Sequence, residues 1–253
     1  MSVEWLLLLL VGFVAGNVNT IVGSGSLLTF PTLIALGYPP LLANVSNTVG
    51  LAPGSVSGAV GYRRELTGQR RRVARLGVIA GAGGGLGAAL LLALPATTFE
   101  RIVPVLILAA CGLVIVQPRL SAWVRSRAEA THARGGSHPV LPLAITGTSI
   151  YGGYFGAAQG VILMAVLGVL VDDDLQRLNA LKNALTAVVN VTAALVFVLT
   201  TTVAWDAALL LAAGSIVGGQ TGARVGRRID PTLLRVAIVT VGLAVVARYV
   251  LWS

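Results

Sequence analysis

The sequence predicts an all-α polytopic membrane protein with two homologous, inverted repeats, each a re-entrant helical hairpin followed by three transmembrane helices. Three observations lead to this fold class. The chain is 56% hydrophobic and only 11% charged, with a mean hydropathy of +0.87, which is more apolar than a soluble domain can bury. The same order of features occurs twice along the chain: a long apolar stretch broken by glycines and amides, a helix with a central asparagine, a glycine-rich helix and a terminal helix. The arginines gather in a few blocks between apolar stretches.

The two copies keep a nearly constant offset. The glycines at 83, 84 and 87 precede those at 218, 219 and 222 by 135 positions, and Asn47 precedes Asn183 by 136. Two unrelated apolar sequences of similar composition would not hold one register in this way. We therefore expect a first transmembrane repeat at residues 1–118, a basic cytoplasmic linker at 119–138 and a second repeat at 139–253.

Eight apolar stretches are expected along the chain, most of them near the roughly 20 residues that a membrane-spanning helix needs. They are residues 4–36, 40–62, 74–94, 99–118, 139–171, 178–201, 204–224 and 231–251. The first and fifth exceed 30 residues and are interrupted by glycines and amides at 16–25 and 147–160, which favours a broken helix. Each is either one long tilted helix or a pair of half-helices that returns to the side it entered.

Arginine placement distinguishes these alternatives, because cytoplasmic loops collect basic residues. If all eight stretches cross, the two arginine blocks before residue 135 face one side, whereas Arg177 and Arg224 face the other. If the first and fifth stretches are hairpins, all basic residues share one side except Arg101 and Arg248. We therefore expect six full crossings of the inner membrane, with both termini outside. Three crossings per repeat invert the second copy, an arrangement that supports alternating access in secondary transporters.

Several remaining features have structural interpretations. Residues 1–16 carry only Glu4 as an early charge and no signal-peptide cleavage pattern, so we expect them to stay in the fold. Cys111, the single cysteine, is expected to pack as a small hydrophobe. The repeated glycine clusters are spaced three and four apart, which predicts close helix packing and not a nucleotide-binding loop. The acidic triplet at 172–174 predicts a solvated turn that begins the next helix.

Five segments resemble a known family in their order, spacing and duplication. They are 12–16 (GFVAG), 22–31 (VGSGSLLTFP), 39–47 (PPLLANVSN), 57–63 (SGAVGYR) and 214–228 (GSIVGGQTGARVGRR). With these segments the chain resembles the TauE/SafE family of membrane transporters, which is associated with sulfite and organosulfonate export. The resemblance implies a carrier for small sulfur-containing anions. The chain departs from the family pattern at Ser24 and Ser26, where glycines are usual, and at Asn17 and Asn19, where small or acidic residues are usual.

The interrupted stretches supply the first candidate substrate-binding residues. Asn17, Asn19, Ser24 and Ser26 lie in the first one, and Gln159 lies in the second. Their amide and hydroxyl groups could replace the water shell of an oxyanion. The alternative is that they satisfy backbone groups that the broken helices leave free.

The helices that follow supply three more candidates. Asn47 and Asn183 occupy matching positions and must face the protein interior, where they either line a substrate path or join helices by hydrogen bonds. Lys182, the only lysine, either neutralises an anion entering from the cytoplasm or extends its side chain to the membrane interface.

The leading hypothesis is a secondary transporter of a small anion, such as sulfite or a sulfonate. The alternatives are a carrier for a small carboxylate or another non-sulfur metabolite, and a membrane scaffold that transports nothing. An enzyme is not expected, because the apolar stretches contain no histidine and no paired carboxylates. The expected partners are the anionic substrate, the lipid bilayer, a coupling proton or Na+, and a second copy in a homodimer. We expect no cofactor, metal or nucleic acid.

Overall fold

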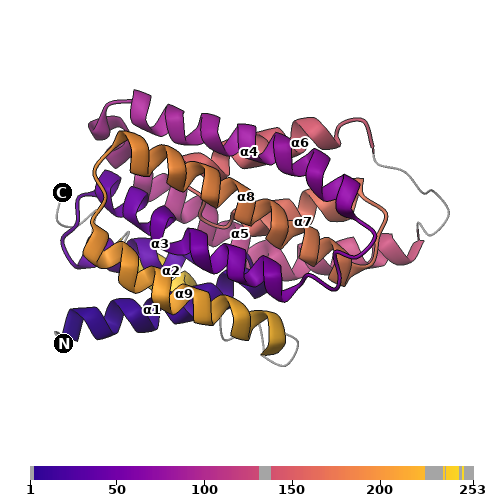
Figure 1. Ribbon diagram of the computed structural model, residues 1–253, viewed down its shortest axis with the longest axis horizontal. Helices are drawn as coiled ribbons and strands as arrows, with labels where there is room; N and C mark the ends of the chain where they lie inside the picture. Colours follow the sequence, from indigo (N-terminus) through magenta and orange to yellow (C-terminus); the bar gives the residue numbers. More distant parts are fainter. Residues whose placement is uncertain (1–2, 131–137, 226–235, 237, 245–246, 248–253) are drawn as a thin grey trace.

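The computed structural model describes residues 3–130, 138–225, 236, 238–244 and 247 (Figure 1). This part of the chain is a helical bundle without a β-strand, which confirms the all-α prediction. The expected positions of both termini, the arginines at 227, 228, 235 and 248, and most of the stretch 231–251 lie outside the described residues. The helices are α1 (Val3–Ile21), α2 (Ser26–Ala35), α3 (Pro40–Gly61), α4 (Arg70–Ala93), α5 (Ala96–Ala130), α6 (Leu141–Tyr154), α7 (Gln159–Leu170), α8 (Leu175–Thr200) and α9 (Trp205–Val225).

Length and composition identify candidate membrane-spanning helices in the described part of the chain. Four segments are long and apolar enough to cross: α1, α4, residues 96–120 of α5, and α8. The helix α5 continues to residue 130, so the first part of the predicted linker is helical. Cys111 is buried on α5 and lies against Gly242, as a packing residue would.

Both over-long apolar stretches are broken into two helices. The first broken segment consists of α1 and α2, joined by residues 22–25, and the second consists of α6 and α7, joined by residues 155–158. The backbone enters the left-handed region at Gly23 (φ 90°), Gly156 (φ 74°) and Ala158 (φ 57°), which interrupts an α-helix. A single unbroken helix through either stretch is therefore excluded.

The relative directions of paired helices follow from their contacts. Two helices are parallel when later residues of one contact later residues of the other. Gly12 of α1 lies against Leu211 of α9, and Gly16 lies against Ser215, so these two helices are parallel and side by side in Figure 1. In the same way, Gly83 lies against Ser149 and Gly87 against Ile150, so α4 and α6 are parallel.

The helices α3 and α8 are antiparallel. Asn190 donates to Ser55 at 2.8 Å, whereas Ser46, earlier on α3, accepts from the N–H of Ala204, just after α8.

These directions define two ends of the helical bundle. We call the end where α1, α3 and α9 begin the Asp206 end, and the end where α4, α6 and α8 begin the Asp173 end.

Each broken segment starts and finishes at one end of the bundle. The first starts at the Asp206 end and leads into α3 there, where the Tyr38 hydroxyl donates to Asp206 at 3.0 Å. The second starts at the Asp173 end and finishes there, because the N–H of His138 donates to the carbonyl of Leu170 at 3.3 Å. The segments therefore enter the bundle from opposite ends.

Most described arginines lie at one end. Arg101, near the start of α5, belongs to the Asp206 end together with Glu4 and Glu100. The arginines of the Asp173 end, in the described ranges, are Arg63, Arg64, Arg70, Arg71, Arg72, Arg75, Arg119, Arg125, Arg127, Arg177 and Arg224.

The glycine clusters pack helices together, as predicted. A Cβ atom on Gly153 would lie 2.0 Å from the carbonyl oxygen of Gly84, and one on Gly218 would lie 2.1 Å from that of Phe13. Neither position can hold a side chain without moving backbone. Inside a bilayer, where apolar surface does not drive helices together, such close contact is the main source of helix association.

Ion pairs join the starts of α4 and α8. The Asp173 carboxylate accepts from Arg72 at 2.5 Å and from Arg177 at 2.7 Å. Burial raises the pKa of Asp173, but the hydrogen bonds from Arg72, the Asp174 N–H and Arg177 outweigh burial and hold the pKa below its ordinary value. Asp174 caps α8 by accepting from the N–H of Gln176 at 2.9 Å, which confirms the predicted helix start.

Replacing Gly153 by alanine should destabilise the bundle, because the new methyl group would overlap the Gly84 carbonyl. We expect a loss of about 1–3 kcal/mol, the usual cost of overpacking. Gly147→Ala is the matched control on the same helix, since nothing lies within 4 Å of a Cβ there. Thermal unfolding in detergent measures both. Equal melting temperatures for the two variants would contradict the packing role.

Asp173→Asn should lower the melting temperature at neutral pH by about 2–4 °C, the shift that about 1 kcal/mol produces in a domain of this size. Because the folded-state pKa of Asp173 is lowered, its stabilising effect is present above the unfolded pKa of about 4 and is lost as the pH falls through the folded value. The difference between wild type and variant should therefore shrink below about pH 4. A difference as large at pH 3 as at pH 7 would count against the ion pairs.

Candidate functional site

The two broken segments meet in the interior of the bundle at a pair of glycines. The N–H of Gly160 donates to the carbonyl of Gly23 at 3.0 Å. A Cβ atom on either residue would lie 2.4 Å from the Cα atom of the other. The backbones are therefore in direct contact at this crossing, and both residues must be glycine.

The neighbours of these glycines carry unpaired polar groups. Ser24 follows Gly23 and Gln159 precedes Gly160, and each side chain is 1% exposed. The Ser24 hydroxyl and both amide atoms of Gln159 have no hydrogen-bond partner in the described part of the chain. The Gln159 amide lies against Gly152, where a Cβ would come within 2.6 Å of all three of its terminal atoms. A buried polar group without a partner is costly, which makes Ser24 and Gln159 candidates for binding a polar ligand.

A buried cation lies beside the first break. The ammonium group of Lys182 on α8 donates to the carbonyls of Thr20 at 3.1 Å and Asn19 at 3.5 Å, in the last turn of α1. Its side chain is 1% exposed, so the predicted alternative of a side chain that reaches the membrane interface is wrong. Asn183 donates to the same Thr20 carbonyl at 3.2 Å.

No carboxylate neutralises this cation in the described part of the chain. Lys182 takes no part in the salt bridges of Asp173, and no aspartate or glutamate is among the buried residues of the described ranges. The partial negative charge of the α1 C-terminus favours the ammonium group, yet an ion is expensive to bury without a full counter-charge. An anion is the ligand that would supply one.

The second break is held in a corresponding way. Asn44 of α3 donates to the carbonyl of Tyr154, the last residue of α6, at 3.0 Å. Asn183 of α8 does the same for Thr20 near the end of α1. In each broken segment, a backbone carbonyl near the end of the first helix therefore accepts a hydrogen bond from a long helix of the other half of the chain. No lysine accompanies the second contact.

Asn19 belongs to the hydrogen bonds that join three helices. It donates to Ser55 of α3 at 3.1 Å, and Ser55 also accepts from Asn190 of α8 at 2.8 Å. Asn47 and Asn183 lie about two turns from this contact on their own helices. Because α3 and α8 are antiparallel, the two asparagines are displaced toward opposite ends of the bundle. The structure therefore does not bring them to one point.

Three predicted residues lie apart from the crossing or lack a contact to it. The Asn17 amide donates to the carbonyl of Phe13, one turn earlier on α1, at 2.9 Å and accepts from Thr221 of α9 at 2.9 Å, so both its polar atoms already have partners. Asn47 accepts a hydrogen bond from Thr29 of α2. Ser26 is the half-buried first residue of α2. The structure gathers Asn19, Ser24, Gln159, Lys182 and Asn183 around the two breaks.

Sequence reasoning missed three hydroxyl groups. Ser149 and Thr186 are buried with unpaired hydroxyls, and Thr29 is the partner of Asn47. Ser149 lies on α6, one turn before Gly152, and Thr186 lies one turn after Lys182 on α8. The signal that could have found them is this helical spacing from residues already selected.

The chemistry of the site suits an oxyanion. It offers the Lys182 ammonium group, the unpaired Gln159 amide and the unpaired Ser24 hydroxyl, all of which donate hydrogen bonds. Among the described residues, no three histidine, cysteine, aspartate or glutamate side chains lie together as metal ligands would.

One family model and several proteins named as probable membrane transporters match the chain. The sequence model described as "Sulfite exporter TauE/SafE" matches residues 8–249. A "Probable membrane transporter protein" of Haemophilus influenzae is 26% identical over 245 residues, covering 96% of this chain and 93% of that protein. "Probable membrane transporter protein YfcA" of Escherichia coli K12 is 27% identical over 245 residues, covering 95% and 87%. No solved structure matches the chain significantly.

Replacing Gln159 by methionine should leave the melting temperature unchanged or raise it, because the variant removes a buried amide whose atoms lack partners. The relief is about 1–3 kcal/mol at most. Asn190→Leu should instead lower the stability by about 1 kcal/mol, since it deletes the hydrogen bond to Ser55. Thermal unfolding of the purified variants tests the contrast. A Gln159 variant that is the less stable of the two would show that this amide has a structural role.

Proposed function

The chain belongs to the sulfite exporter TauE/SafE family of membrane transporters, and on that premise we propose that it carries a small sulfur-bearing oxyanion, such as sulfite or a sulfonate. The anion binds where the two broken segments cross and passes by alternating access. The gradient of the anion, or of a coupling proton or Na+, supplies the energy.

Lys182 is the observation that carries this proposal. Its ammonium group is buried, has only helix-end carbonyls as partners, and lies on the helix that also presents Asn183 to the first break. An oxyanion would take the remaining charge of the lysine and hydrogen bonds from Ser24 and Gln159, whose side-chain polar atoms have no other partner among the described residues. Charge-assisted hydrogen bonds of this kind are about twice as strong as neutral ones.

Inverted repeats are part of the proposal, and the glycine contacts support them. Gly84 lies against Val189, and Gly219 lies against Gly54. Each member of one pair is 135 positions from a member of the other, so the two contacts are equivalent under exchange of the halves. The packing of α1 on α9 corresponds to that of α6 on α4 in the same way. Opposite entry of the two broken segments agrees with a symmetry axis in the membrane plane.

The arginine distribution supports an orientation. Since cytoplasmic surfaces collect basic residues, we place the Asp173 end in the cytoplasm and the Asp206 end outside. In this orientation Lys182 and Asn183 lie toward the cytoplasm, and Asn47 with Thr29 lies toward the exterior. The anion would meet the lysine from the cytoplasmic side and leave past the asparagine of the opposite half.

The test is anion uptake into proteoliposomes by wild type and Lys182→Met. We expect saturable uptake of sulfite, thiosulfate or an alkyl sulfonate by wild type and loss of more than about ten-fold in the variant, because one charge-assisted contact is worth about 1.5–3 kcal/mol. Arg64→Gln is the control for net charge, since this exposed arginine lies in the α3–α4 connection. Lys182→Arg should retain part of the uptake.

The outcomes separate substrate class from site. Unchanged uptake by a folded Lys182→Met protein would reject the lysine as the anion ligand. Saturable uptake of a carboxylate alone by wild type would reject the sulfur-bearing substrate. Size-exclusion profiles and melting temperatures establish that each variant is folded.

A further inference from the structure

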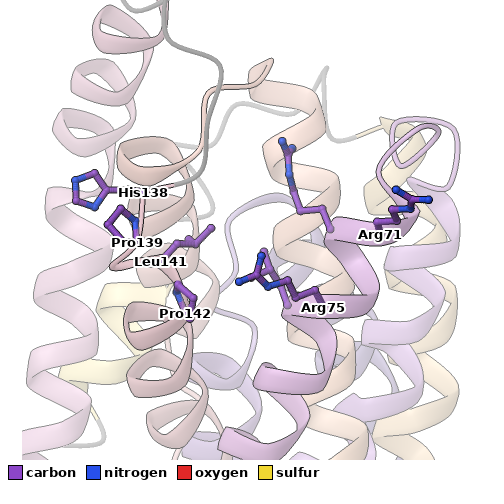
Figure 2. A pocket seen from close by; sticks show the side chains of 8 residues that line it. Arg71, Arg75, His138, Pro139, Leu141 and Pro142 are labelled. Carbon is purple, nitrogen blue, oxygen red and sulfur yellow. The ribbon is translucent and has the colours of Figure 1, made fainter.

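A separate basic pocket lies at the Asp173 end of the bundle. A cavity of about 610 Å³ opens between the starts of α4 and α6 (Figure 2). Figure 2 shows Arg75 reaching across the gap toward Leu141 and Pro142, with His138 and Pro139 on the facing side. The parallel register of α4 and α6, in which Gly83 lies beside Ser149, places Arg75 level with Leu141.

The charges of the pocket are unevenly neutralised. Of its three arginines, Arg72 is paired with Asp173 and Gln69. In the described part of the chain, Arg71 and Arg75 have neither a salt bridge nor a side-chain hydrogen bond, and both are exposed. Two arginines without a counter-charge therefore line the cavity, and His138 adds a polar ring to its lining. Arginine is the side chain best suited to phosphate oxygens, because its planar fork binds two of them at once.

The other walls of the pocket are apolar and continue into surface that faces lipid. Leu76 and Leu141 form buried walls. Just beyond them, Val78 on α4 is 75% exposed and Leu143 on α6 is 73% exposed. Exposed apolar side chains on membrane helices contact acyl chains. The arginines therefore lie where this exposed apolar surface ends, which is the level that the headgroups of a surrounding bilayer would occupy.

We propose that this pocket binds the phosphate headgroup of an anionic phospholipid, with Arg71 and Arg75 on the phosphate and the acyl chains along Val78 and Leu143. A soluble oxyanion would use the arginines but not the apolar walls. Basic pockets between membrane helices at a cytoplasmic surface are a recurrent form of anionic-lipid recognition. This pocket is separate from the crossing of the broken segments, so the lipid-binding proposal does not depend on the proposed transport function.

The experiment measures lipid binding to the purified full chain by native mass spectrometry. Phosphatidylglycerol and phosphatidylcholine are added to delipidated wild type, to Arg71→Gln/Arg75→Gln and to Arg63→Gln/Arg64→Gln. The last variant removes the same charge at the same end but outside the pocket. We expect the pocket variant to bind phosphatidylglycerol about 30-fold more weakly, from the contribution of two arginines at a membrane surface, and the control to bind it as wild type does.

Three results would overturn the proposal. The pocket variant could bind phosphatidylglycerol as tightly as wild type does, or the control could lose binding equally, which would reduce the effect to net charge. Displacement of the lipid by millimolar inorganic phosphate or sulfite would identify a soluble anion as the ligand. Anion uptake by the pocket variant is measured in parallel, so that lipid binding and the proposed transport are judged separately.

Discussion

The need to satisfy backbone groups at two breaks inside a membrane governs this structure. Hydrocarbon offers no hydrogen bonds, so a helix that stops within it must find partners for its free N–H and C=O groups in the protein. The chain meets this need by letting the breaks bond to each other, through Gly160 and Gly23. Amide side chains from α3 and α8 satisfy carbonyls near the ends of α6 and α1.

These partners come from the opposite half of the chain, and this interlocks the two halves. The first broken segment packs on α9 and receives hydrogen bonds from α8, whereas the second packs on α4 and receives one from α3. Small residues make this exchange possible, because helices can approach until backbones touch only where no side chain intervenes. Neither half can therefore complete its own broken helix. The two halves are therefore in contact both at the glycine crossing and along the helices that pack between them.

The two breaks and the close glycine packing could be predicted from the sequence, but only part of the site could. Glycines at helical spacing and amides inside apolar runs have few explanations in a membrane, so the close packing and the two breaks were predictable. The environment of a single side chain was not. Asn47 and Asn183 are equivalent in the duplication, yet one accepts from Thr29 and the other donates to a backbone carbonyl. Lys182 could have reached the interface by length, and only the packing of α8 against the end of α1 turns it inward.

Lys182 makes the two halves of the chain unequal, and under the proposed function this difference has a role in substrate binding. The lysine has no counterpart in the first half, where Ser46 occupies the matching position and accepts from the Ala204 N–H. The carbonyls in the last turn of α1 accept from its ammonium group, and the C-terminal dipole of that helix favours a cation there. A bound oxyanion would supply a full counter-charge. The ammonium group would thus have hydrogen-bond acceptors with or without bound substrate, and the anionic substrate would be the stronger partner.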